Sequence, residues 1–216
     1  MPYRRTENVL RRLAAREEAI LAAATAIAGE GGMAAVQIAT VAARAGIAAG
    51  TVYRYFPSKT DLVAALVASV ANRELAAMRA AGDAAPGPLS ALAACITTFA
   101  ARALNERRVS WAVIGEPVDA EADPARRDFR HSLAAELEER IDAAIAGRHL
   151  PEQDAGFAAS AIIGALMEGL LDPLVPLPAG AAAARAAVQS ATLLALRALG
   201  VVDARARGLV AQCALA

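Results

Sequence analysis

Aromatic residues, cysteines and net charge are what this chain of 216 residues has least of. Phe, Trp and Tyr together make up 4% of the residues, and the only cysteines are Cys95 and Cys213. Two cysteines so far apart in sequence match no usual spacing of metal ligands. We therefore expect both thiols to be inert, rather than part of a metal site or a redox-sensing pair.

Long hydrophobic runs are also missing. The longest candidates, Leu89–Ala101 and Gly156–Met167, are shorter than the roughly 20 apolar residues that a membrane helix needs. The first residues, MPYRRTENVLRR, are charged and lack the apolar segment of a secretory signal. We therefore expect a cytoplasmic protein that has no membrane partner.

The residue patterns of common enzyme sites are absent as well. The sequence has no glycine-rich phosphate-binding loop and no cluster of His and Cys at metal-binding spacing. Neither of the two histidines, His131 and His149, has a plausible nucleophile nearby. We therefore expect no catalytic residues, no metal ion and no cofactor.

Alanine, by contrast, makes up more than a quarter of the chain, and strand-rich segments are hard to find. Because alanine favours helices, the sequence predicts an all-α fold. Apolar periodicity and helix-breaking residues predict helices from Asn8 or Arg12 to Ala28 and over Gln37–Ala45, Ala49–Phe56, about 59–80, Leu89–Leu104, Arg108–Ile114, Pro124–Ala146, Pro151–Leu171, Ala179–Leu199 and Ala204–Ala214.

The net charge of zero hides an uneven distribution along the chain. Residues 1–60 carry eight Lys and Arg against four Glu, a net charge of +4, so the remaining residues carry −4. A basic N-terminal part attracts phosphate groups, and an acidic remainder discourages non-specific wrapping.

One segment, Val36 to Asp61 (VQIATVAARAGIAAGTVYRYFPSKTD), predicts two short helices joined by a tight turn and followed by a capped third helix. Gly46 suits the turn, since glycine enters the left-handed region without steric cost. Val52 and Phe56 lie one turn apart on the inward face of the second helix. Its outward face then carries a hydroxyl, a guanidinium and two phenols, which suits a major groove.

Within this segment, GIAAGTVYRYFPSK at Gly46 to Lys59 resembles the motif of TetR-type transcriptional repressors. The specific part of the resemblance covers roughly residues 10–66. It implies a three-helix, helix-turn-helix DNA-binding domain at residues 1–60, with a connecting helix at about 59–80. It also implies a larger C-terminal helical domain for ligand binding and dimerisation at residues 83–216.

The resemblance also implies which side chains contact DNA. The expected contacts are Gln37, Ala49, Gly50, Thr51, Tyr53, Arg54, Tyr55 and Lys59. Tyr53 and Lys59 are expected at phosphates, and Arg54 is the best candidate for bidentate recognition of guanine. Two positions depart from the family pattern. Gln37 stands where a threonine is common, and Ala48 stands where a serine usually caps the recognition helix, a loss of roughly 1 kcal/mol.

Large apolar residues in the C-terminal part supply the material for a ligand pocket, although most of them must form the core. The candidates for the pocket are Phe99, Trp111, Ile114, Phe129, His131 and Met167. Trp111 and His131 stand out because each combines a ring with a polar tip. Glu168 interrupts an apolar helix, and it is left open whether it faces the cavity, a dimer partner or solvent.

The last two long predicted helices carry small residues at a spacing of four, which lets helix backbones approach closely. Members of the TetR family dimerise through two helices at these positions, so a homodimer is expected. Packing within one chain is the alternative.

Together these features predict a ligand-responsive regulator, most simply a repressor that a small, largely apolar effector releases from a near-palindromic operator on double-stranded DNA. One alternative is a DNA-binding regulator that needs no ligand. Another is a helical small-molecule binding protein with a weak DNA-binding head. The sequence does not identify the effector, the operator, the regulated genes or the sign of regulation.

Overall fold

The computed structural model describes residues 3–116 and 123–213, and every regular element in these ranges is helical. The elements are α1 (Tyr3–Gly31), η1 (Met33–Ala35), α2 (Ile38–Arg44), α3 (Ala49–Tyr55), α4 (Lys59–Asp83), α5 (Pro88–Asn105), α6 (Arg107–Ile114), α7 (Asp123–Ala146), α8 (Ala155–Leu166), η2 (Met167–Leu171), α9 (Ala181–Ala198) and α10 (Asp203–Gln212). The predicted all-α fold is confirmed. No helix in the described ranges is long and apolar enough to cross a membrane.

The largest difference from the predicted bounds is at the first helix. α1 begins at Tyr3 rather than at Asn8 or Arg12, since neither glycine nor proline interrupts the chain between these positions. The last helix was expected to end at Ala214, a residue that lies outside the described ranges.

A second difference concerns the helix predicted at Pro151–Leu171. α8 begins only at Ala155, because the carboxylate of Asp154 caps it by accepting a hydrogen bond from the N–H of Phe157 at 2.8 Å. The far end of the predicted helix contains a change of geometry. The α-helix ends at Leu166, and the π-helical turn η2 continues it to Leu171.

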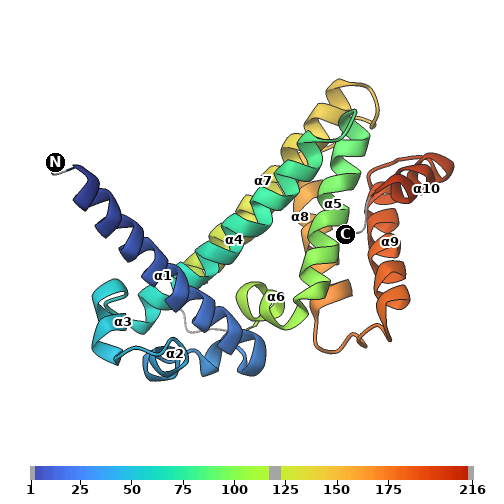
Figure 1. Cartoon of the computed structure of the whole chain (residues 1–216). Helices are drawn as coiled ribbons and strands as arrows, with labels where there is room; N and C mark the ends of the chain where they lie inside the picture. Colours follow the sequence, from blue (N-terminus) through green and yellow to red (C-terminus); the bar gives the residue numbers. More distant parts are fainter. Residues whose placement is uncertain (1–2, 117–122, 214–216) are drawn as a thin grey trace.

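Helices α1 to α3 and the start of α4 form a small N-terminal unit (Figure 1). On α1, Ile20, Ala24 and Ile27 are buried, whereas residues 7–19 are exposed. The buried residues of α1 pack with those of α2, α3 and the first turns of α4 in one apolar core. The N-terminal half of α1 extends away from the rest of the molecule.

The long helix α4 leads from this unit into the C-terminal part, where it packs against α5 and α7. Two buried carboxylates hold it there. Glu74 on α4 accepts hydrogen bonds from Arg102 on α5 at 2.7 and 3.0 Å. Glu136 on α7 accepts one from Arg79 on α4 at 2.8 Å. These charge-assisted hydrogen bonds fix the second half of α4 to its neighbours.

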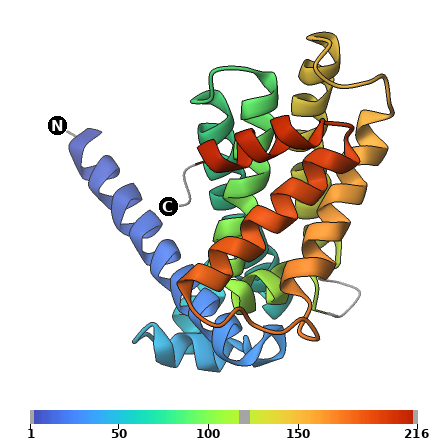
Figure 2. The same cartoon turned by 90° about the vertical axis from the view of Figure 1, so that its right-hand side faces the viewer.

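The C-terminal part is a layered bundle in which α7 packs on α4, α5 and α8, and α9 packs on α5 and α10. Figure 2 shows α10 crossing near one end of α9. The loop between α4 and α5 spans residues 84–87, a few residues after the predicted end of the connecting helix. The division into domains 1–60 and 83–216 stays a prediction.

Candidate nucleic-acid interface

The turn between α2 and α3 requires a glycine. Gly46 has a φ of 66°, in the left-handed region that side chains with a Cβ rarely adopt. The N–H of Ile47 then donates to the carbonyl of Ala42 at 3.0 Å, which closes the end of α2. This local geometry sets the angle at which α3 leaves α2, as expected for a helix-turn-helix.

One face of α3 is anchored in the core and the other is open. Val52 is fully buried and Phe56, directly after the helix, is 4% exposed. Tyr53 is 52% exposed, and Arg54 is exposed beside it. The burial of one face therefore leaves a phenol and a guanidinium on the other, both able to bind phosphates or base edges.

The other side chains predicted on α3 differ in how accessible they are. Ala49 and Gly50 are exposed, and Thr51 is half-buried. Tyr55 is also half-buried, and its ring lies against that of Phe56 with the centroids 6.5 Å apart. Part of the Tyr55 side chain is thus used in packing, so it offers less surface to DNA than Tyr53 does.

Both departures from the family pattern leave a helix start without a side-chain cap. Gln37 precedes α2 but makes no capping hydrogen bond, and its amide nitrogen donates instead to the carbonyl of Ala34 at 2.9 Å. Ala48 precedes α3 and has no side-chain acceptor at all. Neither side chain therefore accepts a hydrogen bond from the first amides of its helix.

The start of α4 is capped by Ser58, whose side chain also hydrogen-bonds to that of Asp61. The N–H of Asp61 donates to the hydroxyl oxygen of Ser58 at 3.0 Å, and this hydroxyl donates to the Asp61 carboxylate at 2.7 Å. This arrangement fixes the first turn of α4. Lys59, the first residue of the helix, is half-buried there, close in sequence to the end of α3.

The basic residues of the helix-turn-helix unit differ in whether they form an ion pair. Arg44 donates to the carboxylate of Glu30 at 2.9 Å, and these hydrogen bonds hold the pKa of Glu30 below its usual value. Within the described ranges, Arg54 forms no ion pair. Arg54 thus keeps a guanidinium available for a new partner, whereas that of Arg44 is engaged.

The six predicted pocket residues do not come together around one cavity. Phe99, Ile114, Phe129 and Met167 are at most 5% exposed and form part of the core. His131 is exposed on α7. Trp111 alone of the six lines either of the two cavities described below. The described residues also contain no cluster of His, Cys, Asp or Glu that could hold a metal ion.

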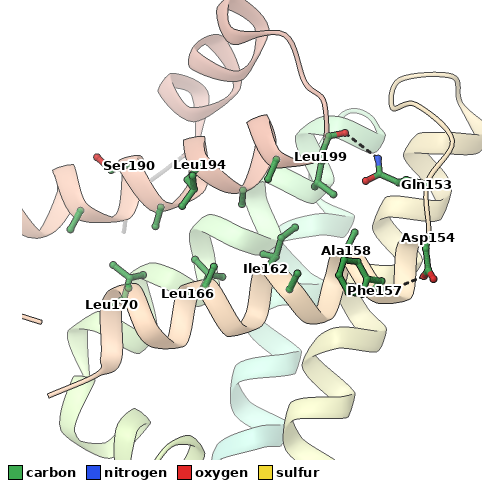
Figure 3. Close-up of a pocket in the computed structure, with 17 residues that line it drawn as sticks. Gln153, Asp154, Phe157, Ala158, Ile162, Leu166, Leu170, Ser190, Leu194 and Leu199 are labelled. Carbon is green, nitrogen blue, oxygen red and sulfur yellow. Dashed lines mark hydrogen bonds between the residues drawn. The ribbon is translucent and has the colours of Figure 1, made fainter. Parts of the chain in front are cut away.

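A groove of about 760 Å³ runs between α8 and α9 (Figure 3). Side chains from both helices point into it, among them Ile162 and Leu166 from α8 and Leu194 from α9. Phe157 at one end is 74% exposed, and Leu194 is 61% exposed. Glu168 is exposed and does not line this groove. The groove is therefore an apolar surface that a single chain leaves open to water.

The small residues predicted on these two helices lie mainly along the groove. Its lining includes Ala161, Ala165, Gly169, Ala187, Ala191 and Ala195. Their short side chains leave room for another helix to approach closely.

One contact between the N-terminal unit and the C-terminal part was not predicted from the sequence. The carboxylate of Glu116 accepts a hydrogen bond from the backbone N–H of Met33 at 2.9 Å, although 83 positions separate the two residues. No sequence pattern links them, and only the packing of α6 against α1 brings them together.

Comparison with known proteins places this helix-turn-helix in a family. Residues 20–66 match the family model described as bacterial regulatory proteins, tetR family. The chain is 44% identical to the HTH-type transcriptional repressor KstR of Rhodococcus jostii over 72 residues, which span 33% of this chain and 32% of that protein. The matched region is thus less than a third of the length of this relative.

A longer match, 31% identical over 144 residues, joins the chain to the uncharacterized HTH-type transcriptional regulator Mb0790c of Mycobacterium bovis. It covers 67% of this chain and 66% of that protein.

Solved structures share the whole fold. A tetR-family regulatory protein from Rhodococcus RHA1 superimposes with a TM-score of 0.71 at 22% identity, covering 87% of this chain and 98% of that one. The regulator FadR from Bacillus subtilis, in complex with stearoyl-CoA, gives 0.70 at 18% identity, covering 86% and 98%. Identities this low establish the fold alone. Taken with the family model and the sequence relatives, the helix-turn-helix shows that the chain belongs to the tetR family of bacterial regulatory proteins.

Proposed function

We propose that the protein is a transcriptional repressor that binds an operator on double-stranded DNA through α3. The observation that carries this proposal is the two-sided α3, with Val52 buried and Tyr53 and Arg54 exposed. Such a helix is held by the core and fits a major groove with its free side. An operator as partner also requires the protein to be in the compartment that holds the chromosome.

The proposed DNA contacts are those predicted from the family motif. Arg54 reads a base edge, while Tyr53, Lys59 and amides at the starts of α2 and α3 that no side chain caps bind phosphates. The net charge of +4 on residues 1–60 supports this arrangement by attracting the DNA backbone.

We further propose a homodimer that forms over the groove between α8 and α9. Phe157 and Leu194 are large apolar side chains exposed on its rim, and the small residues between them permit close helix packing. A second copy of α8 and α9 would cover the groove and form a four-helix bundle. Such a dimer presents two copies of α3, which suits two half-sites of a near-palindromic operator.

The effector in this proposal is small and largely apolar. It binds more tightly to the state of the protein in which α4 holds the two recognition helices at a spacing that does not fit the operator. A coupling of roughly 1–3 kcal/mol is enough to change operator affinity about 5–150-fold. The complex of FadR with stearoyl-CoA supports an apolar effector, since that protein shares the fold.

Two other functions make different predictions. A regulator that needs no ligand binds the operator equally well with and without apolar compounds. A small-molecule binding protein with a weak DNA-binding head shows low DNA affinity with a shallow salt dependence.

Selection of genomic DNA fragments at near-physiological salt tests the proposal directly. The wild type should enrich a near-palindromic motif, and Arg54→Ala should lose preference at particular base pairs, at roughly 1–3 kcal/mol per pair. Arg205→Ala, which removes an exposed guanidinium from α10, is the matched control and should enrich the same motif as the wild type. Identical enrichment by wild type and Arg54→Ala, or none by either, would refute sequence-specific binding through α3.

A further inference from the structure

A second cavity, of about 850 Å³, lies where the N-terminal unit meets the C-terminal part, and we call it the junction cavity. Its walls are the end of α1, the corner between α5 and α6, and the connection from η2 to α9. This volume lies within the range of small-molecule sites. The buried pocket candidates Phe99, Phe129 and Met167 do not line it, whereas the core residues Leu104 and Leu171 do.

Trp111 forms an aromatic wall of this cavity and is held in place by Gly115. A Cβ at Gly115 would lie 2.4 Å from the Trp111 ring, so the ring packs directly on the glycine backbone. Leu104, Val109, Leu171 and Leu177 add aliphatic surface around it. Most of the lining is therefore apolar, with one aromatic face on which a ring can stack.

The wall formed by the connection from η2 to α9 is tied to α6 by one buried side chain. Arg107, 9% exposed, donates to the carbonyl oxygens of Asp172 and Val175, the latter at 2.6 Å. These hydrogen bonds hold together the wall formed by α6 and the wall formed by the connection from η2 to α9. That connection leads directly into α9, one of the two helices in the proposed dimer interface.

The opposite wall reaches the helix-turn-helix unit through Glu116. Its carboxylate accepts the N–H of Met33 at 2.9 Å and lies against Gly32, where a Cβ would be 2.8 Å from a carboxylate oxygen. Within the described residues this N–H is its one hydrogen-bond donor, so the carboxylate, which lines the cavity, can accept further hydrogen bonds. A ligand bound to this carboxylate is therefore separated by only one hydrogen bond from Met33, in the segment that leads into α2.

The charges around the cavity nearly balance. Three glutamates and two arginines line it. Two of these glutamates are already paired, Glu106 with Arg73 at 2.7 Å and Glu30 with Arg44 at 2.9 Å. Because guanidinium and carboxylate groups are both present, the cavity favours neither a cation nor an anion. The carboxylate of Glu116 can still accept a hydrogen bond from a ligand.

We propose that the junction cavity binds a neutral ring compound that carries a hydroxyl group. The ring stacks on Trp111, and the hydroxyl donates to the carboxylate of Glu116. This inference rests on the proposed function, since it supplies the site at which an effector changes operator affinity. Binding there perturbs the contact between Glu116 and Met33 and thereby the orientation of the helix-turn-helix unit.

Trp111 is the only tryptophan in the chain, so energy transfer from it reports on ligands near this site. The probe is 1-pyrenemethanol, a neutral fused-ring alcohol, titrated into the full chain without DNA. Leu177 lines the cavity and is 71% exposed, so Leu177→Asp places a charge in the wall without disturbing the core. Leu174, 91% exposed in the same connection but outside the lining, provides the matched control Leu174→Asp.

We expect saturable transfer in the wild type, affinity at least tenfold weaker in Leu177→Asp, and affinity within twofold of wild type in Leu174→Asp. The hydroxyl is tested separately with 1-methylpyrene, which lacks it. The wild type should bind 1-pyrenemethanol at least fivefold more tightly than 1-methylpyrene, and Glu116→Ala should remove this preference. Absence of saturable transfer, or equal affinities in the two Asp variants, would overturn the inference, as would equal affinities for the two probes.

The regulatory part of the inference needs DNA from the genomic selection. We expect saturating 1-pyrenemethanol to weaken binding of the wild type to the selected DNA at least fivefold, with a smaller change for Leu177→Asp. Intact DNA binding that the probe leaves unchanged would refute regulation through the cavity while the repressor proposal stands. Failure to select any DNA refutes the repressor proposal instead, whatever the titrations show.

Discussion

The hydroxyl oxygens of Thr97 on α5 and Thr192 on α9 lie 3.2 Å apart, and both residues are buried. Thr192 donates its own proton to the carbonyl of Val188 at 3.0 Å, so Thr97 must be the donor between the two threonines. This hydrogen bond fixes α9 to α5 through one face. The other face of α9 is thereby presented to the groove that it shares with α8.

This pair predicts non-additive effects on stability. Thr97→Val removes the donor and should lower the free energy of unfolding by about 1 kcal/mol, whereas Thr192→Val leaves the Thr97 hydroxyl unpaired and should cost about 1–3 kcal/mol. The double variant should cost less than the sum, because no unpaired group remains. Urea unfolding of the four proteins measures the cycle, and strictly additive values would contradict the assigned hydrogen bond.

Substitutions at the N-cap positions of α3 and α4 should change stability in opposite directions. Ser58→Ala removes the hydroxyl that accepts the N–H of Asp61, and should lower the free energy of unfolding by about 1 kcal/mol. Ala48→Ser adds a cap where α3 has none, and should raise it by roughly 0.5–1 kcal/mol. Ala43→Ser, at an exposed position inside α2, is the control for adding a hydroxyl without a cap. A stabilisation no larger than that of the control would show that α3 does not need this cap.

The proposed dimer depends on the apolar groove between α8 and α9. Leu194→Asp places a carboxylate on its rim and should convert the dimer to a monomer, because burying an unpaired charge is strongly unfavourable. Val202→Asp, at a residue that is 74% exposed and outside the groove, should remain dimeric. Sedimentation velocity at micromolar protein distinguishes these states. A Leu194→Asp protein that still sediments as a dimer would place the interface elsewhere.

The two cysteines should react at very different rates. Cys95 is fully buried and donates to the carbonyl of Met78 at 3.2 Å, and burial raises the pKa of its thiol to about 11. Cys213 is half-buried near the end of the described chain. At pH 8 an aromatic disulfide reagent should modify one thiol of the native protein quickly and the second only on unfolding. Cys213→Ser should remove the fast phase. Rapid reaction of the remaining thiol would show that Cys95 is accessible.

Local sequence information was sufficient where the determinant lies within a few residues. The turn at Gly46, the cap formed by Ser58 and Asp61, and the burial of Val52 each depend on neighbours within one or two helical turns. Most helix bounds depend on the same short-range signals. These elements could therefore be predicted from the sequence alone, and they include the helix proposed to contact DNA.

The rest depends on packing between segments far apart in the chain. Phe99 and Trp111 are both aromatic residues on predicted helices, yet the first is buried in the core and the second lines the junction cavity. The contact between Glu116 and Met33 depends on how α6 meets α1, which no local periodicity encodes. Likewise, the partial burial of Tyr55 follows from the position of α3 on the core, and it reduces the surface of a side chain expected to face outward.

The close packing at the C-terminal end of α4 has a mechanical consequence. A Cβ at Gly82 would lie 2.7 Å from the sulfur of Cys95, and Asp83 next to it pairs with Arg140 at 2.8 Å, so this end cannot slide or rotate freely. Lys59, at the other end, lies about 35 Å away at a rise of roughly 1.5 Å per residue. On a lever of that length a tilt of about 5° displaces the far end by about 3 Å. Rearrangements of a fraction of an ångström near Gly82 would therefore be enough to move α3 out of register with a major groove of DNA.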